Sequence, residues 1–193
     1  MAADSERMGR LSDRNRNADL HVSENLFVVV SAGEYQMISE KGLKAIKTFE
    51  GYSPLEYTCV AGKRTIGFGH VLKPNESYVC GVSEEQAEEL LIQDLKTVET
   101  AVDMLVKVPL KEYQRDALVS FAYNIGAYAF QRSTLLKELN AGNYEQVPKQ
   151  LMRWIYVNGK PCYGLSRRRQ AEAALFENKR ERKRSFFYER KKK

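Results

Sequence analysis

The 193-residue sequence predicts an α+β protein with a small N-terminal β lobe followed by a mostly helical lobe. Strand-type segments that flank a glycine loop occur only near the start of the domain, between residues 57 and 68. After residue 83, apolar residues recur at helical spacing in several successive segments. We expect residues 38–178 to form one domain, between an N-terminal extension (1–37) of unknown role and a basic tail (179–193).

The first predicted helix covers residues 39–49, where three apolar residues lie about one turn apart. Ser39 is suited to be its N-cap, and Gly51 is suited to end it. Glu50 therefore lies at the C-terminal end of the helix. The helix dipole disfavours a negative charge there, which suits a carboxyl group that acts as a general acid.

A β-hairpin is predicted next, with strands at residues 57–60 and 64–68 and a three-residue loop around Gly62. In this register Cys59 lies directly opposite Thr65, with their β-carbons about 4.5–5.5 Å apart on one face. The helix-end carboxyl group would then face two polar groups on a hairpin.

Five further helices are predicted from apolar periodicity and capping signals. The first opens with the capping-box pattern Ser-Glu-Glu-Gln at residues 83–86 and continues toward Pro109. The others are expected at residues 110–126, 133–140, 152–156 and 166–177.

Glu50, Cys59 and Thr65 are followed by the run Thr-Ile-Gly-Phe-Gly-His at residues 65–70. This spacing resembles the catalytic constellation of the phage-type lysozymes (glycoside hydrolase family 24). That family usually carries Asp at the position of Cys59, and some members carry Cys. Residues 114–126 and 164–172 resemble its central helix and its late Arg-bearing helix, so that the resemblance extends over about residues 38–178.

The resemblance implies a lysozyme-like fold and a muramidase, a glycoside hydrolase that cleaves the β-1,4 bond between N-acetylmuramic acid and N-acetylglucosamine. In that role Glu50 protonates the leaving oxygen. Thr65 orients a water that attacks from the opposite face with inversion. Cys59 either positions this water or accepts its proton as a thiolate, although an ordinary thiol is mostly protonated at neutral pH.

Four more residues are expected to support the site. Arg168 is a candidate ion-pair or cleft partner for Glu50. Tyr123 and Asn124, on the central helix, are candidate substrate-binding residues. His70, which follows two nearby glycines, is expected to be a buried structural histidine held by hydrogen bonds.

Each catalytic candidate also has an ordinary structural interpretation. A glutamate before a glycine is usually a solvated helix end, a buried cysteine beside a hairpin is usually a small core residue, and threonine favours strands. The common register of Glu50, Cys59 and Thr65 with the run that follows favours the catalytic interpretation.

Cysteine and histidine are scarce: the chain has three Cys and two His, without a Cys-x-x-Cys pair. We therefore expect no metal site and no cofactor. A serine hydrolase is disfavoured because no Gly-x-Ser-x-Gly elbow occurs. A disulfide between Cys59 and Cys80 or Cys162 would inactivate the enzyme.

No apolar run is long enough for a membrane span or a signal-peptide core, so synthesis in the cytoplasm without an export signal is expected. A phage endolysin would then reach peptidoglycan with the help of a holin, and we expect a monomer. Delivery by a secretion machine or inside a virion is the alternative route.

The tail at residues 179–193 holds nine Lys or Arg and two Glu, a net charge of +7. The whole chain is +6, so the remainder is −1. The tail is either a solvated segment or one that adheres to an anionic envelope surface. Two other classes stay open: a nucleic-acid-binding protein that uses this tail, and a lysozyme-like binding module without activity.

Overall fold

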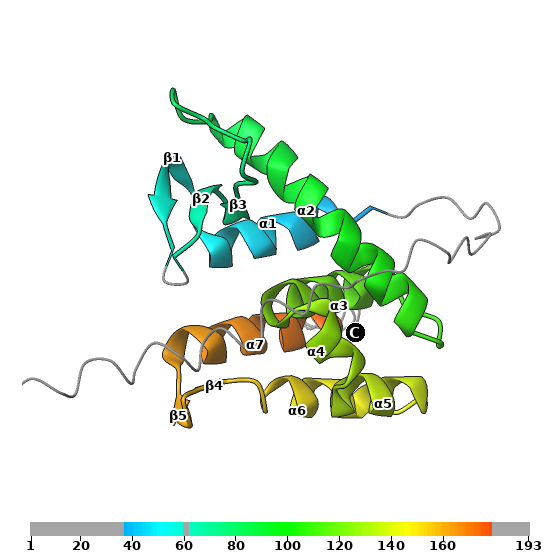
Figure 1. The fold of residues 1–193 in the computed structure, drawn as a ribbon. Helices are drawn as coiled ribbons and strands as arrows, with labels where there is room; N and C mark the ends of the chain where they lie inside the picture. Colours follow the sequence, from blue (N-terminus) through cyan, green and yellow to red (C-terminus); the bar gives the residue numbers. More distant parts are fainter. Residues whose placement is uncertain (1–36, 60–61, 179–193) are drawn as a thin grey trace, which may run out of the picture.

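The computed structural model describes residues 37–59 and 62–178. A three-stranded sheet and α1 lie on one side, α2 runs from this lobe along the molecule, and the later helices form the second lobe (Figure 1). The helices are α1 (Glu40–Glu50), α2 (Glu84–Leu105), α3 (Glu112–Ile125), α4 (Ala127–Gln131), α5 (Thr134–Asn140), the 3₁₀ helix η1 (Tyr144–Gln146), α6 (Val147–Leu151) and α7 (Tyr163–Phe176). The strands are β1 (Ser53–Thr58), β2 (Arg64–Gly67), β3 (His70–Val71), β4 (Tyr156–Val157) and β5 (Lys160–Pro161). The predicted α+β class is confirmed.

Helix α1 begins and ends where the sequence predicts. The hydroxyl of Ser39 accepts a hydrogen bond from the Gly42 amide at 3.1 Å, which satisfies one of the unpaired N–H groups of the first turn. Ser39 is itself held by Asp116 of α3, which accepts hydrogen bonds from its backbone N–H at 3.0 Å and from its hydroxyl. At the other end Gly51 adopts φ 72°, a conformation that L-residues rarely take. The start of α1 is thereby tied to the central helix.

The predicted register of the hairpin is wrong by two residues. Tyr57, rather than Cys59, lies opposite Thr65. The turn starts earlier than predicted, because the Cys59 amide donates to Lys63 O at 2.9 Å and the Gly62 amide donates to Cys59 O at 2.8 Å. Cys59 therefore lies diagonally to Thr65, at a longer expected separation than that of a directly opposed pair.

The strands themselves also differ from the prediction. β1 begins at Ser53, four residues before the predicted start, and the sheet gains a third strand, β3, in the order β1-β2-β3. Pro54 is tolerated because β1 is an edge strand, and the Pro54 carbonyl accepts from the Val82 amide at 2.9 Å.

The helix predicted at residues 152–156 is wrong. The helix of this region is α6, and it ends at Leu151. Pro148 lies in its first turn, where the missing N–H of proline costs no intrahelical hydrogen bond. Trp154 follows outside any helix or strand and packs edge-on against Phe121, with ring centroids 5.6 Å apart. Its apolar character reflects core packing rather than helical periodicity.

Strands are also not confined to the start of the domain, contrary to the prediction. β4 and β5 form a hairpin around Asn158 (φ 49°) and Gly159 (φ 75°). A two-residue turn with positive φ at both positions is typical of an Asn-Gly pair. The short helix α4 was not predicted either.

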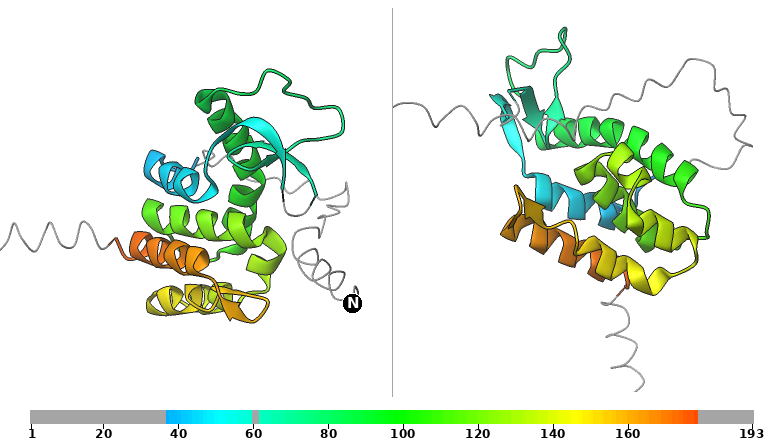
Figure 2. Two further views of the ribbon diagram at one scale, coloured as in Figure 1. Left: turned by 90° about the vertical axis from the view of Figure 1, so that its left-hand side faces the viewer. Right: turned by 60° about the horizontal axis from the view of Figure 1, so that its bottom comes forward.

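The central helix α3 is the core of the fold. Figure 2 shows α3 layered between α1 on one side and α7 on the other. Residues 115–122 are all buried, a pattern that a helix shows when other elements surround it. Within the described residues, no helix has both the length and the apolar character that a bilayer span requires.

Candidate active site

Glu50 is held by an ion pair that joins the first and last helices of the domain. Its Oε1 accepts a hydrogen bond from Nη1 of Arg168 at 2.6 Å. The Glu50 side chain is 23% exposed and the Arg168 side chain 5%, so the carboxyl group reaches solvent while its partner is buried. The structure thus brings together the two residues that the sequence suggested as a pair.

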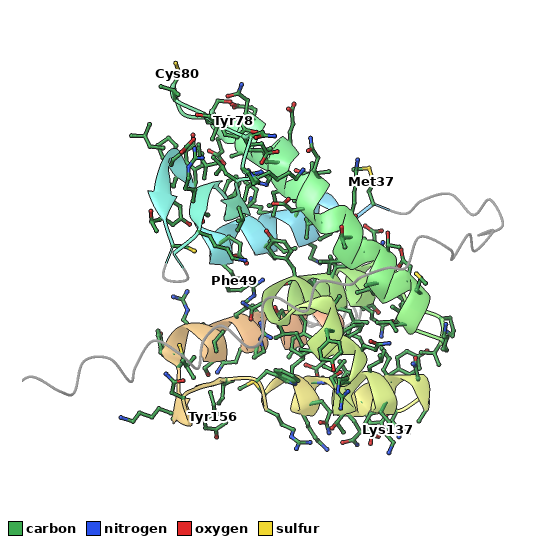
Figure 3. The ribbon with its side chains drawn as sticks, in the orientation of Figure 1. Met37, Phe49, Tyr78, Cys80, Lys137 and Tyr156 are labelled. Atoms are coloured by element: carbon green, nitrogen blue, oxygen red, sulfur yellow. The ribbon has the colours of Figure 1, made fainter. Side chains whose placement is uncertain are left out.

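Arg168 is fixed by further contacts besides Glu50. Its Nε donates to Oε1 of Glu172 at 3.1 Å, and its Nη2 donates to the Ser120 carbonyl at 3.1 Å. Its guanidinium carbon lies 5.2 Å from the ring centroid of Phe49, which extends from α1 toward α7 (Figure 3). A planar guanidinium held on three sides leaves little freedom to its fourth contact, the Glu50 carboxyl group.

Glu172 supports this arrangement from one turn further along α7. It is almost fully buried and accepts from the Ser120 hydroxyl at 2.8 Å and from Arg169 Nη2 at 3.2 Å. Burial raises the pKa of Glu172 above its ordinary value, while Arg169, Arg168 and Ser120 oppose that rise. Glu172 belongs to the late helix that the resemblance covers, but neither Glu172 nor Ser120 was predicted to be a site residue.

Asn124 lies beside this cluster and is linked to it through Arg169. The Arg169 guanidinium donates to Asn124 Oδ1 at 2.8 Å and lies 4.8 Å from the ring centroid of Phe121. Burial lowers the pKa of Arg169 to about 10. The side-chain carbonyl of Asn124 is thus engaged within the protein, which gives Asn124 a structural contact in addition to the substrate contact expected of it.

Thr65 lies on β2, buried to 3% exposure. Its hydroxyl donates to the Lys63 carbonyl at 3.0 Å. A hydroxyl has one hydrogen and two acceptor lone pairs, so Thr65 Oγ1 keeps acceptor capacity for a neighbouring donor. A water molecule bound there would donate a hydrogen bond to Thr65. Cys59, half-buried at the start of the turn, is diagonal to it.

The loop between β2 and β3 brings backbone close to Glu50. A β-carbon added to Gly69 would lie 3.8 Å from Glu50 Oε2, and Gly69 has φ 92°, which favours glycine. Oε2, the oxygen that Arg168 does not hold, thus lies beside the β2–β3 turn. The two oxygens of Glu50 therefore have different surroundings.

His70, the next residue, is a buried histidine with a partner on each ring nitrogen. Nδ1 lies 2.9 Å from Asp94 Oδ2 on α2, and Nε2 lies 3.3 Å from Glu76 Oε2. Burial raises the pKa of Asp94, while His70 opposes the rise. These contacts attach the β2–β3 turn to α2, which is the structural role expected of His70.

Tyr123 faces the same region from α3. Burial raises the pKa of its phenol, and the nearby carboxyl groups of Asp94 and Glu50 raise it further. Its role in substrate binding stays a prediction. The structure thus brings Glu50 and Arg168 together beside the β2–β3 turn, but it does not place Cys59 directly opposite Thr65.

Comparison with known protein families agrees with the fold and the site described above. A family model described as phage lysozyme matches residues 47–172, well over half of the chain. The chain belongs to the phage lysozyme family. The segment that matches contains the three-stranded sheet, α3 and most of α7, including Glu50 and Arg168.

Individual relatives agree with the family. The chain is 46% identical over 145 residues to the endolysin of Acyrthosiphon pisum secondary endosymbiont phage 1, an alignment that covers 73% of this chain and 98% of the relative. It is 43% identical to the endolysin of Bacillus phage B103 over 72% of its own length, but spans only 53% of that relative. Among solved structures, the muramidase domain of SpmX from Asticaccaulis excentricus superposes with a TM-score of 0.68 at 36% identity, over 73% of this chain and 97% of that domain.

Proposed function

We propose that this phage lysozyme is a muramidase that hydrolyses the β-1,4 bond between N-acetylmuramic acid and N-acetylglucosamine in peptidoglycan. The observation that carries the proposal is the Glu50 carboxyl group, held at the end of α1 by buried Arg168 and still 23% exposed to solvent. The names of its relatives, endolysins and a muramidase domain, support the same substrate.

In the proposed reaction Glu50 gives a proton to the glycosidic oxygen as the bond to the anomeric carbon breaks. A water molecule attacks that carbon from the opposite face, so that the configuration inverts. Thr65 Oγ1, whose own hydrogen is donated to Lys63, accepts a hydrogen bond from this water and orients it. The proton that the water loses passes to Cys59 if its thiol is ionised, and otherwise to solvent.

Arg168 contributes position rather than proton transfer. It fixes one oxygen of Glu50 and leaves Oε2, next to Gly69, as the oxygen that carries the transferable proton. General acid catalysis requires this proton within hydrogen-bonding reach of the leaving oxygen. A carboxyl group held on one side satisfies that requirement better than one that rotates freely.

The biological role that we propose is that of a phage endolysin. It acts as a monomer, reaches the wall through a membrane lesion made by a holin, and uses its basic tail to adhere to anionic envelope surfaces. The tail and residues 1–36 of the N-terminal extension lie outside the described residues. Their roles therefore rest on the sequence alone.

The test is lysis of permeabilised Gram-negative cells by wild type and Glu50→Gln, followed as loss of turbidity. Gln keeps the shape of the side chain but has no acidic proton, so activity should fall by about 10²–10⁴-fold. Glu40→Gln, at the exposed first turn of the same helix, is the matched control and should remain active. A folded Glu50→Gln protein that clears cells within a few-fold of wild type would refute the proposal.

A further inference from the structure

Tyr57 occupies the position that faces Thr65 across the hairpin. Directly opposed residues of an antiparallel pair point to the same face of the sheet, so the Tyr57 side chain lies on the face that carries Thr65. Thr65 is 3% exposed whereas Tyr57 is 43% exposed. An accessible aromatic ring thus lies next to the hydroxyl that is proposed to hold the water.

Among residues 37–59 and 62–178, the Tyr57 ring forms no aromatic or cation–π pair. Within the described residues its hydroxyl makes no hydrogen bond, whereas Tyr52 donates to the Val82 carbonyl at 2.6 Å and Tyr144 to the Pro109 carbonyl at 2.7 Å. Buried or half-buried tyrosines usually satisfy their hydroxyl in this way. Tyr57 instead leaves both its hydroxyl and much of its ring available to a ligand.

The sheet that carries Tyr57 lies beside Glu50, because a β-carbon added to Gly69, in the turn after β2, would lie 3.8 Å from Glu50 Oε2. Electrostatics agree with this placement, since Glu50 and Tyr57 both contribute to the raised pKa of Tyr123, after burial and Asp94. Tyr57 belongs to β1 and Tyr123 to α3, so the two tyrosines come from different lobes.

We propose that Tyr57 is a glycan-binding residue, whose ring face receives the apolar face of the pyranose ring next to the bond that Glu50 protonates. This inference rests on the proposed muramidase function and deepens it. Ring C–H groups make one face of a pyranose apolar, and an exposed aromatic ring is the surface that such a face covers favourably. Contact through the ring face, rather than through the hydroxyl, sets the sugar plane and thereby the direction of the glycosidic oxygen toward Glu50.

The experiment measures the binding of soluble, uncross-linked glycan oligomers of alternating N-acetylglucosamine and N-acetylmuramic acid by calorimetry. The parent is the Glu50→Gln protein, which keeps the site but does not consume the ligand. Tyr57→Ala and Tyr57→Leu in that parent remove the aromatic face, and each should weaken binding by about tenfold, which corresponds to a modest loss of apolar contact. Tyr57→Phe keeps the ring and should bind within about threefold of the parent.

Thr58→Ala is the matched control, because Thr58 is the next residue of β1, is exposed and points to the opposite face. It should bind like the parent. Tyr57→Leu retains apolar bulk, so a folding defect of Tyr57→Ala does not prevent the measurement.

Two results would overturn the assignment while the muramidase proposal survives: unchanged binding by Tyr57→Leu, or a loss in Tyr57→Phe as large as that in Tyr57→Leu. The first removes Tyr57 from the site, and the second transfers its contribution from the ring to the hydroxyl. Absence of glycan binding by the parent, together with absence of hydrolysis by wild type, would overturn both proposals.

Discussion

Arg168 Nη1 lies 2.6 Å from Glu50 Oε1, although the two residues are 118 positions apart in the sequence. The contact joins the C-terminal end of α1 to the middle of α7. The other donors of Arg168 are engaged by Glu172 and by the Ser120 carbonyl. The position of the proposed general acid is therefore set by the helical lobe, while the hairpin that carries Thr65 belongs to the other lobe.

Replacing Arg168 with Lys should lower turnover more than substrate binding. Lysine keeps the positive charge but cannot reproduce a planar fork that contacts Glu50, Glu172 and Ser120 together. Misplacing a catalytic group by about 1 Å costs about 10²-fold, so kcat should fall about 10- to 100-fold with little change in KM. Arg167→Lys, at the neighbouring exposed position, is the control and should stay near wild type. An Arg168→Lys enzyme with wild-type kcat would show that this contact does not position Glu50.

Glu50 and Arg168 were predicted from the sequence as a pair, but the residues that hold Arg168 in place were not. Glu50 was identified by its helix end and by the register of the motif that follows it. Glu172 lies four positions after Arg168, a spacing that equally describes an ordinary surface ion pair on a helix. Only the packing of α7 on α3 shows that Glu172 is buried and bound to Ser120. The sequence of α7 by itself does not show that Glu172 is buried or that it binds Ser120.

The hairpin register could not be predicted for a different reason. A two-residue shift returns every side chain to the same face of the sheet, so the alternation of apolar and polar residues is unchanged. A loop centred on Gly62 is compatible with either register. The length of the turn from Cys59 to Lys63 decides between them, and that length depends on backbone hydrogen bonds rather than on composition. The turn at Asn158 and Gly159, in contrast, has an Asn-Gly pair, which is typical of two-residue hairpin turns, and it was nevertheless not predicted.

Cys59→Asp should preserve lysis, because the carboxylate common in this family can accept the proton of the attacking water. Cys59→Ala should lose most of the activity, since the methyl group neither accepts a proton nor positions water. Initial rates on permeabilised cells measure both effects. Full activity of Cys59→Ala would exclude Cys59 from the reaction.

Alkylation with iodoacetamide provides an independent measurement on the same residue. The reagent should inactivate wild type and leave Cys59→Asp active, since only the former has a thiol at the site. Cys80 is exposed and reacts in both proteins, so it serves as an internal control for labelling. Equal inactivation of the two proteins would assign the effect to Cys80 or Cys162.

Thr65→Val should reduce turnover with only a small loss of stability. Valine keeps the β-branched shape, so β2 should be preserved, but the hydroxyl that accepts from the water is removed. Loss of the bond to Lys63 O should cost about 1 kcal/mol in the free energy of unfolding. Urea titration and kcat on glycan oligomers measure the two effects separately. Thr58→Val on the opposite face is the control, and an equally active Thr65→Val would leave Thr65 as a strand residue only.

Removing residues 179–193 should leave hydrolysis of soluble glycan intact, because every proposed catalytic residue precedes this segment. Binding to isolated envelopes should weaken, since each basic residue near an anionic membrane contributes about 1 kcal/mol. The difference between full-length and truncated protein should shrink as salt is added, because the Debye length falls to about 8 Å at physiological ionic strength. Equal envelope binding at low salt, or a defect that salt does not change, would contradict an electrostatic role.

The raised pKa of the Tyr123 phenol predicts that the protein loses stability at alkaline pH. Burial, with Asp94 and Glu50 nearby, raises the pKa of its phenol in the folded state, while in the unfolded chain the phenol ionises near pH 10. Its contribution to stability is complete below pH 10. Above pH 10 the unfolded state has released the proton and the folded state retains it, so the free energy of unfolding should fall by about 1.4 kcal/mol per pH unit.

Tyr123→Phe isolates this effect, because the chain contains eleven tyrosines and many lysines that also titrate in this range. Urea unfolding of both proteins at pH 8, 9, 10 and 11 gives the comparison. Between pH 10 and 11 wild type should lose about 1 kcal/mol more than Tyr123→Phe, because the phenol of the unfolded chain is already half ionised at pH 10. Between pH 8 and 9 the two proteins should change in parallel. Parallel curves up to pH 11 would mean that the Tyr123 phenol ionises as readily in the folded protein as in the unfolded chain, and that it does not share a buried space with Glu50 and Asp94.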